Sequence, residues 1–260
     1  MDLQLGGRVV VVTGASSGVG LATTRYLKAE GARVVASARD LDRLRRAVGD
    51  LPGPGQVHAA ACDVVDRDSV EAMVAEGVAA FGGVDGVVCN AGRSLMAPIG
   101  DTTDEQIREE LELKVFGAWN VIRAARKHLA ASDAASVVNV NAILARQPET
   151  RLAVTSAARA ALLNLTRTLS QDLGADGIRV NTVALGLIDT GQWRRRYESA
   201  GTAQSYEEWA AAIAADRGIA LGRFGRAEEV AFPIVSFLSP LSSYCTGATI
   251  DVGGGVSRYI

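Results

Sequence analysis

The stretch VVVVTGASSGVGL, residues 9–21, places four consecutive valines before Gly14, Gly18 and Gly20, and a helical pattern follows. Consecutive β-branched residues favour a strand that is buried on both faces. The glycines permit a tight turn and a close approach of the backbone to a ligand. Because the start of a helix attracts phosphate groups, this stretch predicts a strand, a turn and a helix that bind a dinucleotide.

Strand and helix patterns alternate along the rest of the chain. Repeated units of this kind require a parallel sheet with right-handed crossovers. We therefore predict one α/β domain over residues 1–260, a Rossmann-like doubly wound parallel sheet of about seven strands with helices on both faces. The expected helices are 21–30, 42–48, 66–81, 102–131 and 153–174, and the expected strands after the first are 32–40, 57–64, 84–92, 136–142, 177–190 (strand and loop) and one near the C-terminus.

Composition excludes several classes of function. The 260 residues are 48% apolar and 22% charged with a net charge of −2, which gives no electrostatic reason to expect nucleic acid. The apolar runs have the length of strands, so no membrane association is expected, and the absence of a leader pattern favours the cytoplasm. Cys62, Cys89 and Cys245 lack the spacing of a metal site or a disulfide framework, so we expect no metal and buried, apolar thiols.

The end of the second expected strand distinguishes the two nicotinamide dinucleotides, because the ribose 2′ position is bound there. An NAD site offers a carboxylate to the 2′-hydroxyl, whereas Ala38 and Arg39 stand at this strand end. Arginine pairs well with a phosphate dianion, so NADP(H) is the preferred cofactor. Asp40 can still contact a ribose, which keeps NAD(H) as the alternative, and Arg39 can also be a solvated charge at the start of a helix.

The motif TGASSGVG at residues 13–20 resembles the TG-x3-G-x-G fingerprint of the short-chain dehydrogenase/reductase family, and the resemblance extends over the whole chain. It implies an adenine-contacting pair, an NAG motif that closes a strand against the cofactor, and a loop threonine that binds the nicotinamide carboxamide. In that loop Leu185 replaces the family's proline. The cofactor-binding residues implied are Gly14, Ser16, Ser17, Gly18, Val19, Gly20, Arg39, Asp63, Val64, Asn90, Ala91, Gly92, Arg159, Ile188 and Thr190.

The four catalytic positions of the family are all substituted. The resemblance places Thr155 at the tyrosine, Arg159 at the lysine, Ala142 at the serine and Lys114 at the asparagine. A threonine hydroxyl has no accessible anion and cannot replace the tyrosine as general acid or base. Arginine keeps the positive charge but cannot pass protons. The contacts with the cofactor are therefore retained while the family's proton chemistry is lost.

Lys114 is the leading candidate for a replacement acid. A lysine near Arg159 and an oxidised nicotinamide has its pKa lowered, which makes it a better proton donor. Two cations there also favour a substrate with a carboxylate or an enolate. The alternatives are that Lys114 points toward the surface or pairs with Glu110 or Glu112. Asn141 can replace the serine's hydrogen bond only if the strand end is displaced by one residue.

Three functions are consistent with this pattern. The first is an atypical NADP(H)-dependent oxidoreductase that acts on a small carbonyl or hydroxyl substrate, with Lys114, Thr155 and Arg159 as the candidate catalytic residues. The second is a non-catalytic subunit that forms a hetero-oligomer with an active relative. The third is a scaffold reused for a redox-neutral cyclisation, dehydration or decarboxylation. The resemblance also implies a homo-oligomer, a dimer or a homotetramer, built from the long helices and the C-terminal strand.

Residues 191–220 lie where the family has its substrate lid. The aromatic residues Trp193, Tyr197, Tyr206 and Trp209 fit either an apolar substrate pocket or helical core packing. The arginines at 194–196 fit either an acidic ligand or a solvated charged face.

Overall fold

The computed structural model describes residues 2–259 and contains a seven-stranded, fully parallel sheet in the order β3-β2-β1-β4-β5-β6-β9. The predicted fold class is confirmed. The valine run forms β1 in the interior of the sheet, between β2 and β4, and all of its residues are buried, as expected for a strand covered on both faces. The strands of this sheet are β1 (Val9–Thr13), β2 (Arg33–Ala38), β3 (Gln56–Ala61), β4 (Gly86–Cys89), β5 (Ser136–Ala142), β6 (Arg179–Leu185) and β9 (Thr249–Val252).

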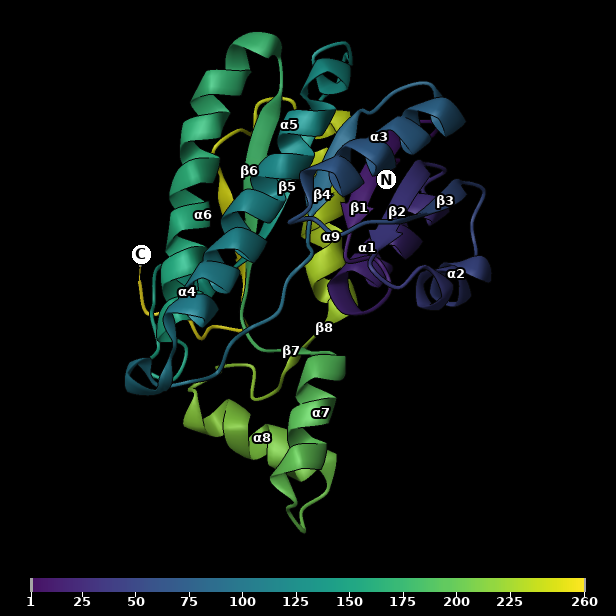
Figure 1. Ribbon diagram of the computed structural model, residues 1–260. Coiled ribbons are helices and arrows are strands. Elements are labelled where there is room, and N and C mark those ends of the chain that lie inside the picture. The colour runs from purple at the N-terminus through teal and green to yellow at the C-terminus, as the bar shows by residue number, and fades with distance from the viewer. Residues whose placement is uncertain (1, 260) are drawn as a thin grey trace.

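Helices cover both faces of the sheet (Figure 1). One face packs against α1 (Gly18–Ala29), α2 (Leu41–Gly49) and α9 (Ala227–Leu238). The other packs against α3 (Arg67–Phe81), α5 (Gly117–Leu129) and α6 (Ala153–Asp172), while α4 (Asp104–Leu111) lies against α6. Short helical turns occur at η1 (Ile99–Asp101), η3 (Ile143–Ala145), η4 (Leu173–Asp176) and η5 (Pro240–Ser242).

The sheet reverses its winding between β1 and β4, because β1 pairs with β2 on one side and with β4 on the other. Ligands of doubly wound sheets bind outside the carboxyl ends of the strands at such a reversal. The ends of β1 and β4 carry the glycine turn and residues 90–92. The fold therefore brings these two motifs together.

The expected helix over 102–131 is divided into three parts. Between α4 and α5 lies a π-helical segment, η2 (Glu112–Phe116), which contains Lys114. Its wider turn changes the direction of the side chains that follow, and such π-bulges occur frequently at functional sites. The first helix also begins earlier than expected, at Gly18, because its first turn contains two glycines, which the periodicity does not assign to a helix.

Two helices project from the main body beyond the carboxyl ends of the strands (Figure 1). They are α7 (Gly191–Ala200) and α8 (Tyr206–Asp216), and a two-stranded sheet of β7 (Ile188–Asp189) and β8 (Gly225–Arg226) lies at their base. Aromatic rings join the two helices, with Trp193 6.0 Å from Trp209 and Tyr197 5.4 Å from Tyr206 between ring centroids. These aromatic residues form a local core rather than a substrate pocket; only Trp193 of the four also lines the main cavity.

The three cysteines do not share one environment. Cys62 and Cys89 are buried, and burial raises their thiol pKa values to about 11 and about 12. Cys245 is exposed, so the expectation of a buried thiol is wrong there, because this residue follows η5 in the turn before β9. Within residues 2–259, no helix has both the length and the apolar character needed to cross a membrane.

Candidate active site

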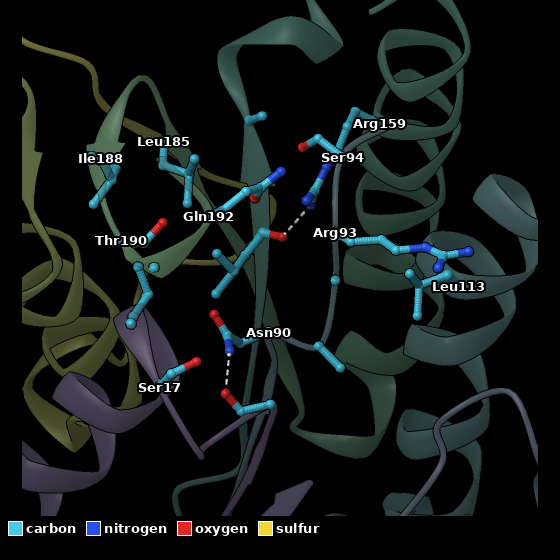
Figure 2. A pocket seen from close by; sticks show the side chains of 18 of the residues that line it. Ser17, Asn90, Arg93, Ser94, Leu113, Arg159, Leu185, Ile188, Thr190 and Gln192 are labelled. Atoms are coloured by element: carbon cyan, nitrogen blue, oxygen red, sulfur yellow. Dashed lines mark hydrogen bonds between the residues drawn. The ribbon is translucent and has the colours of Figure 1, made fainter. Parts of the chain in front are cut away.

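A cavity of about 1150 Å³ lies at the carboxyl ends of the strands and extends to α7. Figure 2 shows Ser17 and Thr190 on one side of it and Arg93 and Arg159 on the other. Every predicted cofactor residue except Gly20 lines this cavity: Gly14, Ser16, Ser17, Gly18, Val19, Arg39, Asp63, Val64, Asn90, Ala91, Gly92, Arg159, Ile188 and Thr190.

The glycine turn presents the start of α1 to the cavity. Gly14 and Gly18 have φ angles of +66° and +55°, a backbone conformation that residues other than glycine rarely adopt. Ser17 occupies the N-cap position, but its side chain makes no capping hydrogen bond, and the first turn contains no acidic residue. The positive end of the helix dipole is therefore not neutralised by the protein, which suits an anionic group such as a pyrophosphate.

Gly20 acts inside the turn rather than at the cavity wall. A Cβ atom placed on Gly20 would lie 2.4 Å from the carbonyl oxygen of Gly14 and 2.6 Å from Nδ2 of Asn90. This amide nitrogen donates hydrogen bonds to the carbonyl oxygens of Thr13, at 2.9 Å, and Gly14, at 3.3 Å. Asn90 thus fixes the turn from the neighbouring strand end, and the close packing around it requires glycine at position 20.

The far end of the cavity contains the groups expected to bind the 2′ position of the adenosine ribose. Arg39 is exposed on the cavity wall and forms no ion pair with any residue in the described part of the chain. Asp40 is the N-cap of α2, and its Oδ1 accepts a hydrogen bond of 2.9 Å from the backbone amide of Arg43. Because capping engages Asp40, Arg39 is the charged side chain more available to a ligand.

Of the four positions that the resemblance aligns with the family's catalytic residues, two, Ala142 and Arg159, line the main cavity. The Nη1 atom of Arg159 donates a 2.7 Å hydrogen bond to the carbonyl oxygen of Val140 (Figure 2). Its Nε atom is buried and has no hydrogen-bond partner within residues 2–259. Burial lowers the pKa of Arg159 to about 10, so the guanidinium remains charged at neutral pH.

Thr155 and Lys114 meet in a buried cluster with Glu110. Lys114 Nζ and Thr155 Oγ1 each donate a 2.5 Å hydrogen bond to Glu110 Oε2, and the backbone amide of Leu95 donates to Thr155 Oγ1 at 3.1 Å. The side chains of Lys114 and Glu110 are 0% and 3% exposed. Burial, followed by the charge of Arg159, lowers the pKa of Lys114 to about 8.

The buried cluster adjoins the main cavity through a second, much smaller cavity. This cavity has a volume of about 10 Å³, and Lys114 and Arg159 both line it. A volume of this order approaches the minimum that holds one water molecule. The residues that line both cavities are Val64, Ala91, Leu113, Val140 and Arg159.

Asn141 does not take over the role of the missing serine. Its side chain is fully buried, where Nδ2 donates to the carbonyl oxygen of Arg159 at 3.0 Å and Oδ1 accepts from the amide of Ala142 at 2.9 Å. Asn141 is not among the residues that line the cavity, so the condition under which it could replace the serine is not met. Among the polar residues of the cavity wall that the sequence did not indicate are Ser94 and Gln192 (Figure 2).

The comparisons with known proteins agree with this architecture. The family model described as enoyl-(acyl carrier protein) reductase matches residues 14–257. The chain is 32% identical over 256 residues to the 3-oxoacyl-[acyl-carrier-protein] reductase FabG of Thermotoga maritima, which covers 98% of this chain and 99% of that protein. The chain therefore belongs to the short-chain dehydrogenase/reductase family.

Two solved structures are similar over nearly the whole chain. An NADPH-bound short chain oxidoreductase from Pseudomonas aeruginosa PAO1, described as containing an atypical catalytic center, is 41% identical, with a TM-score of 0.92 and coverage of 97% of this chain and 98% of that one. The L-sorbose reductase of Gluconobacter frateurii, in complex with NADPH and L-sorbose, is 30% identical, with a TM-score of 0.95 and complete coverage of both chains.

Proposed function

We propose that the protein is an NADP(H)-dependent oxidoreductase that acts on a small carbonyl or hydroxyl compound by a proton route unlike that of its family. The observation that carries this proposal is one cavity whose wall joins Arg39, the glycine turn, Thr190 and Arg159. Similarity to two NADPH-bound structures supports the choice of cofactor. The chemistry that the nicotinamide supplies when bound is hydride transfer.

The arrangement of the wall fits a dinucleotide in one orientation. Asp63 and Val64 would hold the adenine, Arg39 the 2′-phosphate, and the amides at the start of α1 the pyrophosphate. Ile188 and Thr190 would hold the carboxamide. The unsatisfied Nε of Arg159 supports a role in binding ribose hydroxyls, because a buried donor without a partner is otherwise costly.

Proton transfer is assigned to Lys114, acting across the small cavity that it shares with Arg159. With its pKa lowered to about 8, the ammonium group of Lys114 can release and regain a proton near neutral pH. Glu110 balances its charge, and Thr155 holds Glu110 in place through a 2.5 Å hydrogen bond. Thr155 and Glu110 are therefore positioning residues, while Arg159 faces the reacting groups.

Deuteride transfer tests the oxidoreductase assignment directly. The protein is incubated with a panel of aldehydes and ketones and with NADPH that carries deuterium at the hydride-donating carbon, and the products are analysed by mass spectrometry. The proposal predicts an alcohol product that contains deuterium. NADPH binding without deuterium transfer to any member of the panel would favour a redox-neutral catalyst or a non-catalytic subunit instead.

The pH profile of turnover tests the proton route. We expect kcat/KM to depend on a group with a pKa near 8, and this dependence to disappear, with a large loss of kcat, when Lys114 and Glu110 are replaced together by methionine and glutamine. The double replacement is preferred because it removes both partners of the buried ion pair and so leaves neither of them unpaired. A double variant with unchanged kcat and an unchanged pH profile would exclude Lys114 as the acid.

We also propose that the protein is a homo-oligomer, a dimer or a homotetramer. Large apolar side chains are exposed on η2, α9 and β9, with Phe116, Phe232 and Ile250 at 56%, 61% and 40% exposure, which supports burial against further copies of the chain. Light scattering after size-exclusion chromatography tests the oligomeric state, and a monomer would contradict the proposal.

Unpaired thiols at all three cysteines suit a reducing compartment, so we propose that the protein is cytoplasmic.

A further inference from the structure

The three consecutive arginines of α7 have different surroundings. Arg194 is fully engaged: its Nη2 lies 2.9 Å from Asp189 Oδ2, and its guanidinium carbon lies 3.6 Å from the centroid of the Tyr206 ring. Arg195 and Arg196 form no ion pair with any carboxylate of residues 2–259, and both line the main cavity. One arginine of the run therefore stabilises the lid, and two face the space in which a ligand would lie.

Arg196 is the more enclosed of the two. It is half-buried, and its guanidinium carbon lies 4.6 Å from the ring centroid of Trp193. Trp193 is itself held by Phe224, at 4.9 Å between ring centroids, so the stack has a fixed base. Burial lowers the pKa of Arg196, and no acidic group opposes this effect. A partly buried cation without a counter-charge is unfavourable in the free protein and suits a site for an anion.

The two arginines lie toward different ends of the cavity. Arg195 Nη1 would lie 3.3 Å from a Cβ atom on Gly191, and the methyl group of Thr190 would lie 3.3 Å from one on Gly18. Arg195 thus lies over the start of α7, and Thr190, the residue before that start, is the one that contacts the glycine turn. Arg196 instead stacks on Trp193, which packs with the cluster that contains Ile143 and Val256, next to Ala142. Arg196 is thus on the substrate side.

The other charged residues on the substrate side are mostly paired and do not oppose an anion. Glu149 is bound by Arg217, and Glu109 by Arg93. Glu112 is the carboxylate in this part of the wall that has no ion pair within residues 2–259. The remaining wall is largely apolar and includes Met96, Leu144, Leu152 and Val256. This side therefore combines a cationic group on the lid with an apolar surface.

Building on the proposed function, we infer that the substrate is a carbonyl or hydroxyl compound with an apolar body and an anionic group, a carboxylate or a phosphate, which Arg196 binds. A bidentate guanidinium contact with such a group is strong and directional. Because the contact lies on the lid, it also couples substrate binding to the position of α7 over the cavity.

The test uses calorimetry to compare the binding of an anionic compound with that of a neutral counterpart, for several such pairs, to the protein saturated with NADP⁺. The pairs are levulinate and phenylpyruvate with their methyl esters, and phenyl phosphate with phenol provides the phosphate arm. We expect the anionic member of at least one pair to bind about tenfold more tightly or better, and Arg196→Gln to remove this preference. Arg195→Gln is the matched control on the same helix and should retain the preference, because Arg195 lies over Gly191 and does not stack on Trp193.

NADPH titration of the same variants shows whether Arg196 binds the phosphates of the cofactor or the anionic group of the substrate. We expect Arg196→Gln to bind NADPH as the wild type does, which also shows that it is folded. Equal binding of anion and neutral partner, or no binding of any anion at millimolar concentration, would overturn the inference. So would a loss of NADPH affinity in Arg196→Gln with the preference unchanged. Failure of the wild type to bind NADPH would instead overturn the proposed function.

Discussion

Replacing Lys114 by methionine should destabilise the protein strongly. Lys114 and Glu110 form an ion pair at 2.5 Å with side chains 0% and 3% exposed. Removing one partner of a buried pair leaves an unpaired charge, which costs about 3–5 kcal/mol. The hydroxyl of Thr155 still donates to Glu110, and the charge of Arg159 is nearby, so we expect the lower end, about 3 kcal/mol.

Urea unfolding at pH 7, followed by circular dichroism, measures this loss. The double variant Glu110→Gln/Lys114→Met removes both charges and keeps an acceptor for the Thr155 hydroxyl, so it should recover more than half of the lost free energy. Lys127→Met, at an exposed position of α5, is the matched control and should change stability by less than about 0.5 kcal/mol. Equal stability of Lys114→Met and the wild type would refute the buried pair.

Two further changes test the glycine turn and the ion pair at the start of α9. Gly20→Ala should lower the melting temperature and weaken NADPH binding about tenfold or more, because its Cβ would lie 2.4 Å from the Gly14 oxygen. Gly49→Ala is the control and should be neutral, because a Cβ atom there meets nothing within 4 Å. Equal melting temperatures and equal NADPH affinities of the two variants would contradict this prediction. Hydrogen bonds from Arg223 and the Arg226 amide lower the pKa of Glu229 to about 2, so its contribution, present above pH 4.5, is lost as pH falls toward 2. The free energy of unfolding of Glu229→Gln should therefore fall less than that of the wild type between pH 4.5 and pH 2. The same fall in both proteins would contradict this prediction.

The order of elements could be predicted because it depends on short-range patterns. The valine run and the run 136–142 predict strands, and the structure has β1 and β5 at these residues, with the glycine turn directly after β1. The large cavity follows from the same information, because parallel strands bring their carboxyl ends to one edge. Fourteen of the fifteen predicted cofactor residues line that cavity.

The catalytic end could not be predicted in the same way. The position of Lys114 depends on the π-helical segment that contains it, which has no signature in residue spacing. The sequence leaves pairing of Lys114 with Glu110 or Glu112 open, and it gives no sign that the pair with Glu110 is buried against Thr155. The pairing of Arg194 with Asp189, which separates it from Arg195 and Arg196, depends on the turn of β7 into α7.

The central claim, that the cavity is an NADP(H) site, is tested most directly by titrating the protein with NADPH, NADH and their oxidised forms, following fluorescence or calorimetric heat. The account predicts that NADPH binds at least about tenfold more tightly than NADH, and that Arg39→Gln reduces NADPH affinity to the NADH level. Absence of binding by all four nucleotides, or equal binding of NADPH and NADH that is insensitive to Arg39, would contradict it.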